Sequence, residues 1–115
     1  MAPLSINSFS LCILNTFARK ISVPTSTLDA VSEGHGIGPV DFIWIDVQGA
    51  ELDVFRGAPR TLATTRFIYT EYSDRELYEG QPRLRDLARC LSDFELMVRY
   101  PGDALFRNRT GGQTA

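Results

Sequence analysis

Three acidic residues stand at or just after the ends of apolar segments, where their carboxylates could act on a bound molecule. Asp46 follows the run VDFIWI, Glu71 follows the run RFIYT, and Glu51 stands in the first turn of an expected helix. In open parallel sheets, ligands bind beyond the carboxyl ends of the strands. A carboxylate at that position can accept the proton of a reacting hydroxyl group.

Each of these acids also has a purely structural interpretation. Asp46 precedes a helix, where a carboxylate satisfies free backbone N–H groups and interacts favourably with the helix dipole. Glu71 can form a loop salt bridge, and an acid in the first turn of a helix, such as Glu51, is unremarkable. The residue pattern alone leaves both interpretations of each residue open.

The histidine and the cysteines carry weaker signals. His35 is the only histidine and lies in the loop sequence GHGIG, with no cysteine or second histidine at the spacing of metal ligands. We interpret it as a solvated loop residue.

Cys12 and Cys90 both lie in apolar contexts, where a free cysteine packs as a small core residue. Two cysteines provide no disulfide framework, which predicts a cytoplasmic protein.

The first half of the chain divides into short elements. A strand is predicted at residues 21–23, ended by Pro24. A helix capped by Ser26, with Asp29 three residues on, follows and stops at a pair of glycines. The next run, residues 40–46, has no polar alternation, which is typical of a strand buried on both faces in a parallel sheet. We therefore expect its aromatic residues, Phe42 and Trp44, in the core.

The second half of the chain also divides into short expected helices and strands. Residues 51–58 predict a helix, residues 66–72 a second buried strand, and Pro82 opens a further helix. Strands at 94–100 and 104–108 are separated by a Pro-Gly-Asp turn. The predicted fold class is α/β, with parallel strands joined by helical crossovers and a C-terminal antiparallel hairpin.

Three tyrosines, Tyr69, Tyr72 and Tyr78, group near the end of the strand that carries Glu71. They could line a pocket there, although tyrosine at strand ends is also common in proteins that bind nothing at that position.

Composition excludes several classes of partner. The chain has 115 residues, the length of one domain. A net charge of −2 and a pI of about 5.3 provide no electrostatic basis for binding nucleic acid or a membrane. No apolar stretch approaches transmembrane length. Lys20 is the only lysine among the basic residues, which indicates a GC-rich, bacterial genome. The sequence has no nucleophile elbow, Walker loop or glycine-rich loop after a strand.

The stretch VDFIWIDVQGAELDVFRGA resembles the signature of the FkbM-type methyltransferases, a strand followed by Asp-Val-Glu-Gly-x-Glu and a helix ending in Gly-Ala. The upstream segment VPTSTLD and the downstream segments IYTEYSDRELYEGQPRLRDLARCLSDFEL and YPGDALFRN resemble further segments of the family in the same order. The resemblance covers residues 21–108.

This resemblance implies a partial class I methyltransferase (Rossmann-like) sheet. It also implies methyl transfer from S-adenosylmethionine to a hydroxyl of a small molecule, such as a sugar or another natural product. Carried over, Asp46, Glu51 and Glu71 fall on the family's strand-end acids. We expect Asp46 to accept the hydroxyl proton, with Glu51 and Glu71 in support, and Asp46, Gln48 and Gly49 to contact the cofactor. Gln48 departs from the family pattern, which has glutamate there, and an amide cannot accept a proton.

The resemblance is to the C-terminal half of the family's domain, without the glycine-rich cofactor loop. We divide the chain into an unassigned segment (1–20), the half-domain (21–109) and a disordered tail (110–115). The family places two further strands between those at 21–23 and 40–46. Without them the first strand has no neighbour, and FIWI becomes an unpaired apolar edge. We therefore expect the chain to behave as a fragment that self-associates through this edge.

Two other function classes remain open on the sequence. One is a non-catalytic methyltransferase remnant that acts as a binding or assembly module. The other is a metal-assisted enzyme in which Asp46, Glu51 and Glu71 supply hard oxygen ligands; the methyltransferase interpretation needs no metal.

Overall fold

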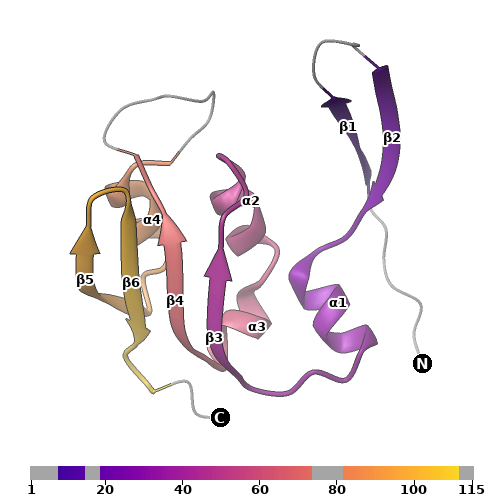
Figure 1. The fold of residues 1–115 in the computed structure, drawn as a ribbon. Helices are drawn as coiled ribbons and strands as arrows, with labels where there is room; N and C mark the ends of the chain where they lie inside the picture. The colour runs from indigo at the N-terminus through magenta and orange to yellow at the C-terminus, as the bar shows by residue number, and fades with distance from the viewer. Residues whose placement is uncertain (1–7, 15–18, 74–81, 112–115) are drawn as a thin grey trace.

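The computed structural model describes residues 8–14, 19–73 and 82–111, with the side chains described from residue 21 on. Six strands and four helices make up this part of the chain (Figure 1). In chain order they are β1 (Ser8–Leu14), β2 (Arg19–Thr25), α1 (Leu28–Gly34), β3 (Val40–Ile45), α2 (Glu51–Arg56), α3 (Pro59–Ala63), β4 (Thr65–Glu71), α4 (Leu84–Cys90), β5 (Phe94–Tyr100) and β6 (Asp103–Asn108).

The main sheet is mixed, with strand order β3-β4-β6-β5. Strands β3 and β4 are parallel, and α2 and α3 connect them. Strand β6 is antiparallel to both of its neighbours, so the predicted C-terminal hairpin is confirmed. The prediction of parallel strands holds for one pair only, because β6 inserts between β4 and β5.

Strand β2 lies outside the main sheet. It pairs antiparallel with β1 in a separate two-stranded sheet, so the expectation that it has no neighbour is wrong. It also continues through Pro24 to Thr25 instead of ending at the proline. A strand at the edge of a sheet tolerates proline because its outward side donates no ladder hydrogen bond.

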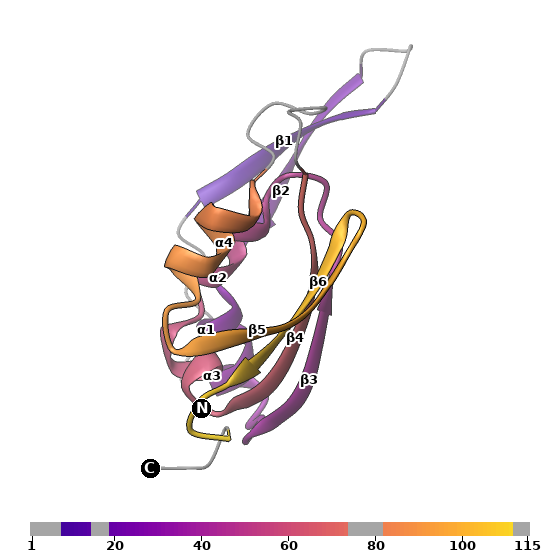
Figure 2. The ribbon, with the colours of Figure 1, turned by 90° about the vertical axis from the view of Figure 1, so that its left-hand side faces the viewer.

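Helices α2, α3 and α4 cover one face of the main sheet (Figure 2). The core lies between these two layers, and its largest fully buried apolar side chains are those of Ile68, Leu87, Leu91 and Phe106. In the second half of β4, Ile68 and Thr70 face the helices and are buried, while Phe67, Tyr69 and Glu71 face the other way and are half-buried. The helix-covered face therefore holds the hydrophobic core of the described chain.

The exposure of β3 corrects the sequence interpretation. Phe42 is 51% exposed and Trp44 is 76% exposed, so neither belongs to the core. Among the described residues, β3 stands at one end of the strand order, the edge position that the sequence predicts for it. Both side chains alternate with Ile43 and Ile45, which pack toward the helices, and thus point to the uncovered face.

Helix α1 begins one residue later than the capping pattern predicts. Thr27, not Ser26, is its N-cap, and its Oγ1 accepts a hydrogen bond from the Ala30 N–H at 3.1 Å. The Asp29 carboxylate instead reaches α3, where it accepts from the N–H groups of Arg60 (2.9 Å) and Thr61 (2.7 Å). Burial alone would raise the pKa of Asp29, but a hydrogen bond from the Thr61 hydroxyl (2.7 Å), the two backbone hydrogen bonds and the charge of Arg60 together lower it.

Three further predictions concern the two cysteines, the C-terminal tail and the possibility of a membrane-spanning helix. Cys90 is free, half-buried and packed against the core, as predicted, whereas the side chain of Cys12 lies outside the described residues. Within the predicted tail, Thr110 and Gly111 form a turn, and residues 112–115 are outside the described ranges. Among the described residues, no helix is both long and apolar enough to cross a membrane.

Candidate active site

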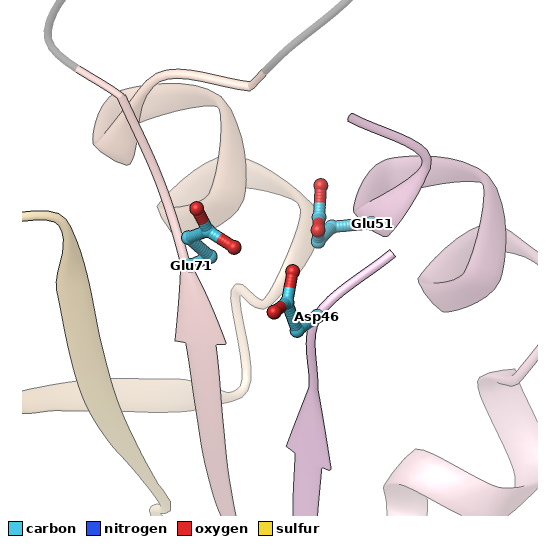
Figure 3. Close-up of side chains that lie close together, drawn as sticks. All are labelled: Asp46, Glu51 and Glu71. Carbon is cyan, nitrogen blue, oxygen red and sulfur yellow. The ribbon is translucent and has the colours of Figure 1, made fainter. Parts of the chain in front are cut away.

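The three acids singled out in the sequence meet at one end of the main sheet (Figure 3). Asp46 directly follows β3, Glu71 is the last residue of the parallel neighbour β4, and Glu51 opens α2. One carboxylate oxygen from each lies within 4.8 Å of the other two. The carboxyl ends of parallel strands meet at the same edge of a sheet, which explains why residues 25 positions apart in the sequence become neighbours.

Glu51 is the buried member of the group, only 1% exposed. Its two carboxylate oxygens accept hydrogen bonds from the backbone N–H groups of Val47 and Gly49, both at 3.0 Å. A buried carboxylate is stable only when such donors replace its water shell. Glu51 therefore fixes the loop between β3 and α2, and its oxygens are committed to that loop.

The same loop positions Asp46 through Gln48. The Gln48 Nε2 donates a hydrogen bond to the Asp46 Oδ1 at 2.9 Å. Gln48 adopts a left-handed conformation (φ 52°), and Gly49 follows with φ 105°. The left-handed conformation is uncommon for a residue with a side chain, such as Gln48, whereas Gly49 adopts a positive φ without steric clash. The loop thus turns sharply enough to aim both Asp46 and Gln48 toward the end of the sheet.

Glu71 has the most perturbed acidity of the group. A hydrogen bond with Asp46, followed by burial and by the charges of Asp46, Glu51 and Asp103, raises the pKa of Glu71 from 4.5 to about 7. A hydrogen bond between two carboxyl groups requires a proton on one of them. Glu71 therefore keeps its proton up to about neutral pH and donates it in a hydrogen bond to Asp46.

Asp103 is a site residue that the sequence interpretation missed, because its Pro-Gly-Asp context was assigned to a turn. It begins β6 and lies opposite Glu71 in the β4–β6 register. Burial, and then a hydrogen bond with Asp103, raises the pKa of Tyr69. The predicted hairpin places Asp103 only beside Tyr100 of β5, so no sequence signal brings it next to β4.

The predicted tyrosine group separates into different roles. Tyr69 faces the uncovered side of the sheet, with its ring centroid 6.5 Å from that of Trp44 and 6.2 Å from that of Tyr100. Tyr72 is buried, and its hydroxyl donates to the Tyr100 carbonyl at 2.7 Å, so it supports the structure. Tyr78 is outside the described residues.

The remaining candidate residues lie away from the carboxylates. His35 is exposed at the C-terminal end of α1, which confirms the loop interpretation.

The three acids offer the oxygen ligands that Mg²⁺ or Ca²⁺ prefers. Both oxygens of Glu51, however, already accept hydrogen bonds from backbone N–H groups. The Asp46–Glu71 pair is therefore the part of the cluster that can react.

Comparison with known proteins agrees with the sequence resemblance. A family model described as the methyltransferase FkbM domain matches residues 4–104. The 2-O-methyltransferase NoeI of Sinorhizobium fredii (strain NBRC 101917 / NGR234) is 52% identical over 96 residues, which cover 80% of this chain and 40% of the relative. The matched part of this chain therefore spans about 40% of the length of the relative. No solved structure matches.

Proposed function

The chain belongs to the FkbM methyltransferase family, and on that premise we propose that it carries the acidic part of an S-adenosylmethionine-dependent O-methyltransferase site. The observation that carries the proposal is the Asp46–Glu71 pair at the ends of β3 and β4, with the pKa of Glu71 raised to about 7. A proton acceptor works best when its pKa lies near the working pH. The acceptor molecule is a small hydroxyl compound, such as a sugar or another natural product.

The residues present fit the chemistry of the cofactor. When bound, S-adenosylmethionine supplies a methyl group on a positively charged sulfonium sulfur. Asp46, Glu51, Glu71 and Asp103 gather negative charge at one end of the sheet, which attracts a cation. The amide of Gln48 and the backbone of Gly49, which has no side chain to obstruct a ligand, would contact the cofactor beside Asp46.

The Asp46–Glu71 pair is the proposed proton acceptor. In its fully ionised form it would accept the proton of the acceptor hydroxyl, while bound S-adenosylmethionine would supply the methyl group and leave as S-adenosylhomocysteine. Its geometry would also orient that hydroxyl, because the O–H bond points at the accepting carboxylate and a lone pair of the oxygen is left to face the methyl group. Methyl transfer should therefore increase as pH rises through about 7, where Glu71 loses its proton.

Glu51 has a different role in this proposal. Both of its oxygens hold backbone N–H groups of the loop, so it positions Asp46 and Gln48 without touching the reacting atoms. The sequence interpretation assigned Glu51 as an acid that supports Asp46, and these two hydrogen bonds are consistent with a positioning role.

Calorimetric titration of the full chain with S-adenosylhomocysteine tests the proposal. We expect saturable binding that Asp46→Asn weakens at least tenfold, because this change removes the charge and keeps the size of the side chain. Glu33→Gln, an exposed carboxylate of α1, is the matched control and should leave binding unchanged. A folded chain that binds no S-adenosylhomocysteine would contradict the proposal.

That result would favour a second candidate, a non-catalytic binding or assembly module. Two observations support it: β3 pairs with only one strand among the described residues, and glutamine stands at position 48 where the family has glutamate. Such a module would stay folded without cofactor and would form a stable complex through its uncovered surfaces.

A further inference from the structure

The acids at the carboxyl end of the main sheet differ in the hydrogen-bond donors that surround their carboxyl groups. A carboxylate that accepts hydrogen bonds from neutral donors is stabilised in its charged form. A carboxyl group that forms a hydrogen bond with another carboxylate is stabilised in its protonated form, because only a proton can join the two. The donors around each acid therefore indicate where the site holds a proton.

Two of the acids are held by the loop between β3 and α2. The Glu51 oxygens accept hydrogen bonds from the backbone N–H groups of Val47 and Gly49, both at 3.0 Å. The Asp46 Oδ1 accepts a hydrogen bond from the Gln48 Nε2 at 2.9 Å. The left-handed backbone of Gln48 (φ 52°) brings its amide back to Asp46, two residues earlier in the chain. Both carboxylates thus have neutral donors.

Asp103 has a neutral donor in Tyr69. Asp103 is the register partner of Glu71, and Tyr69 precedes Glu71 by two residues, so these three side chains share one face of the sheet. The ring of Tyr69 packs edge-on to Trp44, with 6.5 Å between the ring centroids, and lies 6.2 Å from the ring of Tyr100. Burial and the hydrogen bond with Asp103 raise the pKa of Tyr69, so its hydroxyl keeps its proton and donates it to Asp103.

Glu71 lies between these acids, and no neutral donor reaches its carboxyl group from the described part of the chain. Figure 3 shows that group beside those of Asp46, which follows β3, and Glu51, which opens α2. One oxygen from each of the three lies within 4.8 Å of the other two. The hydrogen bond with Asp46, burial, and the charges of Asp46, Glu51 and Asp103 raise the pKa of Glu71 to about 7.

We propose that Glu71 is the carboxyl group that takes the proton of the acceptor hydroxyl, and that Gln48 and Tyr69 are positioning residues that donate to the two carboxylates beside it. The inference rests on the proposed function, and it gives Glu71 the role that the sequence interpretation gave to Asp46. In this step the O–H bond of the acceptor breaks and its proton forms a bond with a Glu71 oxygen. The electron pair stays on the acceptor oxygen, which would receive the methyl group.

The donors explain why the proton goes to Glu71. Asp46 accepts a charge-assisted hydrogen bond from Gln48, and a proton on Asp46 would weaken that bond. Glu71 has no such bond to lose, and a pKa near the working pH suits a proton acceptor. The state that the step produces, a protonated Glu71 that donates to Asp46, is the hydrogen-bonded state of this structure.

The test is a ¹³C NMR titration of the side-chain carboxyl groups of the full chain between pH 5 and pH 9. We expect the Glu71 carbon to titrate with a midpoint near 7. Gln48→Glu keeps the size of the side chain but replaces the donor with a negative charge, and should raise this midpoint by about 0.5–1 pKa unit. Gln48→Met removes the donor without adding charge and should raise it by about 0.3 unit, because Asp46 then presents more of its charge to Glu71.

Tyr69→Phe tests the second donor. It keeps the ring, removes the hydroxyl that donates to Asp103, and should raise the Glu71 midpoint by about 0.3 unit. Tyr100→Phe is the matched control, since its ring packs on the same tyrosine while no hydrogen bond joins its hydroxyl to an acid in the described ranges. It should leave the midpoint unchanged. Circular dichroism checks that each variant folds, and a purely structural role would alter stability without moving the midpoint.

Two results would overturn the inference. One is a step at neutral pH that appears at the Asp46 carbon in place of the Glu71 carbon. The other is a Glu71 midpoint that neither Gln48→Glu nor Tyr69→Phe moves. A chain that binds S-adenosylhomocysteine and gives either result contradicts this inference alone. A chain that titrates as expected but binds no S-adenosylhomocysteine contradicts the proposed function, while the effect of Gln48 and Tyr69 on Glu71 stands.

Discussion

Replacing Glu71 with glutamine should make stability less sensitive to pH. The folded chain raises the pKa of Glu71 from 4.5 to about 7, first through its hydrogen bond with Asp46 and then through burial and neighbouring charges. The folded state therefore binds this proton more tightly than the unfolded state. By linkage, the free energy of unfolding falls as pH rises from about 4.5 to about 7, and stays reduced above that range.

The magnitude follows from the shift. A difference of about 2.5 pKa units corresponds to at most about 3.4 kcal/mol. Glu71 is only half-buried, so solvent screening reduces the expected effect to about 1–2 kcal/mol. Glutamine keeps the size of the side chain and can donate its N–H to Asp46 at every pH. Relative to the unmodified chain, Glu71→Gln should therefore gain about 1–2 kcal/mol between pH 5 and pH 8.

Urea unfolding followed by circular dichroism, at fixed protein and salt concentration from pH 5 to 8.5, measures this change. Glu33→Gln, in the exposed ion pair with Arg60, is the matched control and should shift stability by less than ~0.5 kcal/mol at every pH. A ¹³C NMR titration of the Glu71 carboxyl group provides a direct second readout. Parallel stability curves for the unmodified chain and Glu71→Gln, together with an NMR midpoint near 4.5, would refute the reasoning.

Three further substitutions test the framework around the site by urea unfolding. Glu51→Ala removes the acceptor of two part-buried backbone N–H groups and should cost about 2–4 kcal/mol of unfolding free energy. Asp53→Ala, exposed on the same helix, should cost less than ~0.5 kcal/mol. Gly57→Ala places a Cβ 3.2 Å from the side chain of Thr27 and should cost about 1 kcal/mol; an unchanged midpoint would show that Thr27 moves aside freely. Asn108→Ala removes donors to the carbonyls of Leu62 (3.2 Å) and Thr65 (2.9 Å) in the core and should cost about 2–3 kcal/mol, and a smaller loss would mean that water replaces the amide.

Much of this molecule was accessible from local sequence signals. The apolar runs at 40–46 and 66–72 predict β3 and β4, because a buried strand needs a continuous run of large side chains. Gly57 marks the end of α2 and Pro59 marks the start of α3, because glycine fits the end of a helix and proline fits its first turn. Once two parallel strands are predicted, their end residues Asp46 and Glu71 must come together.

Local signals failed where the outcome depended on which segments lie side by side. Trp44 and Phe42 have core-like residue types, yet they are exposed because no helix packs on that face of β3 among the described residues. Asp103 joins the acidic group only because β6 inserts antiparallel beside β4. Strand β2 gained a partner in β1, which no pattern in residues 1–20 predicted.

The sequence by itself determined most of the elements, because short-range periodicity and turn residues encode them, and its signature motifs indicated the family and the three acids. Only the tertiary structure decided what each acid does. It buried Glu51 under two backbone N–H groups, and it placed Asp46 and Glu71 close enough to share a proton. The pKa of a carboxyl group and the exposure of an aromatic ring depend on neighbours that are distant in sequence, and folding alone supplies those neighbours.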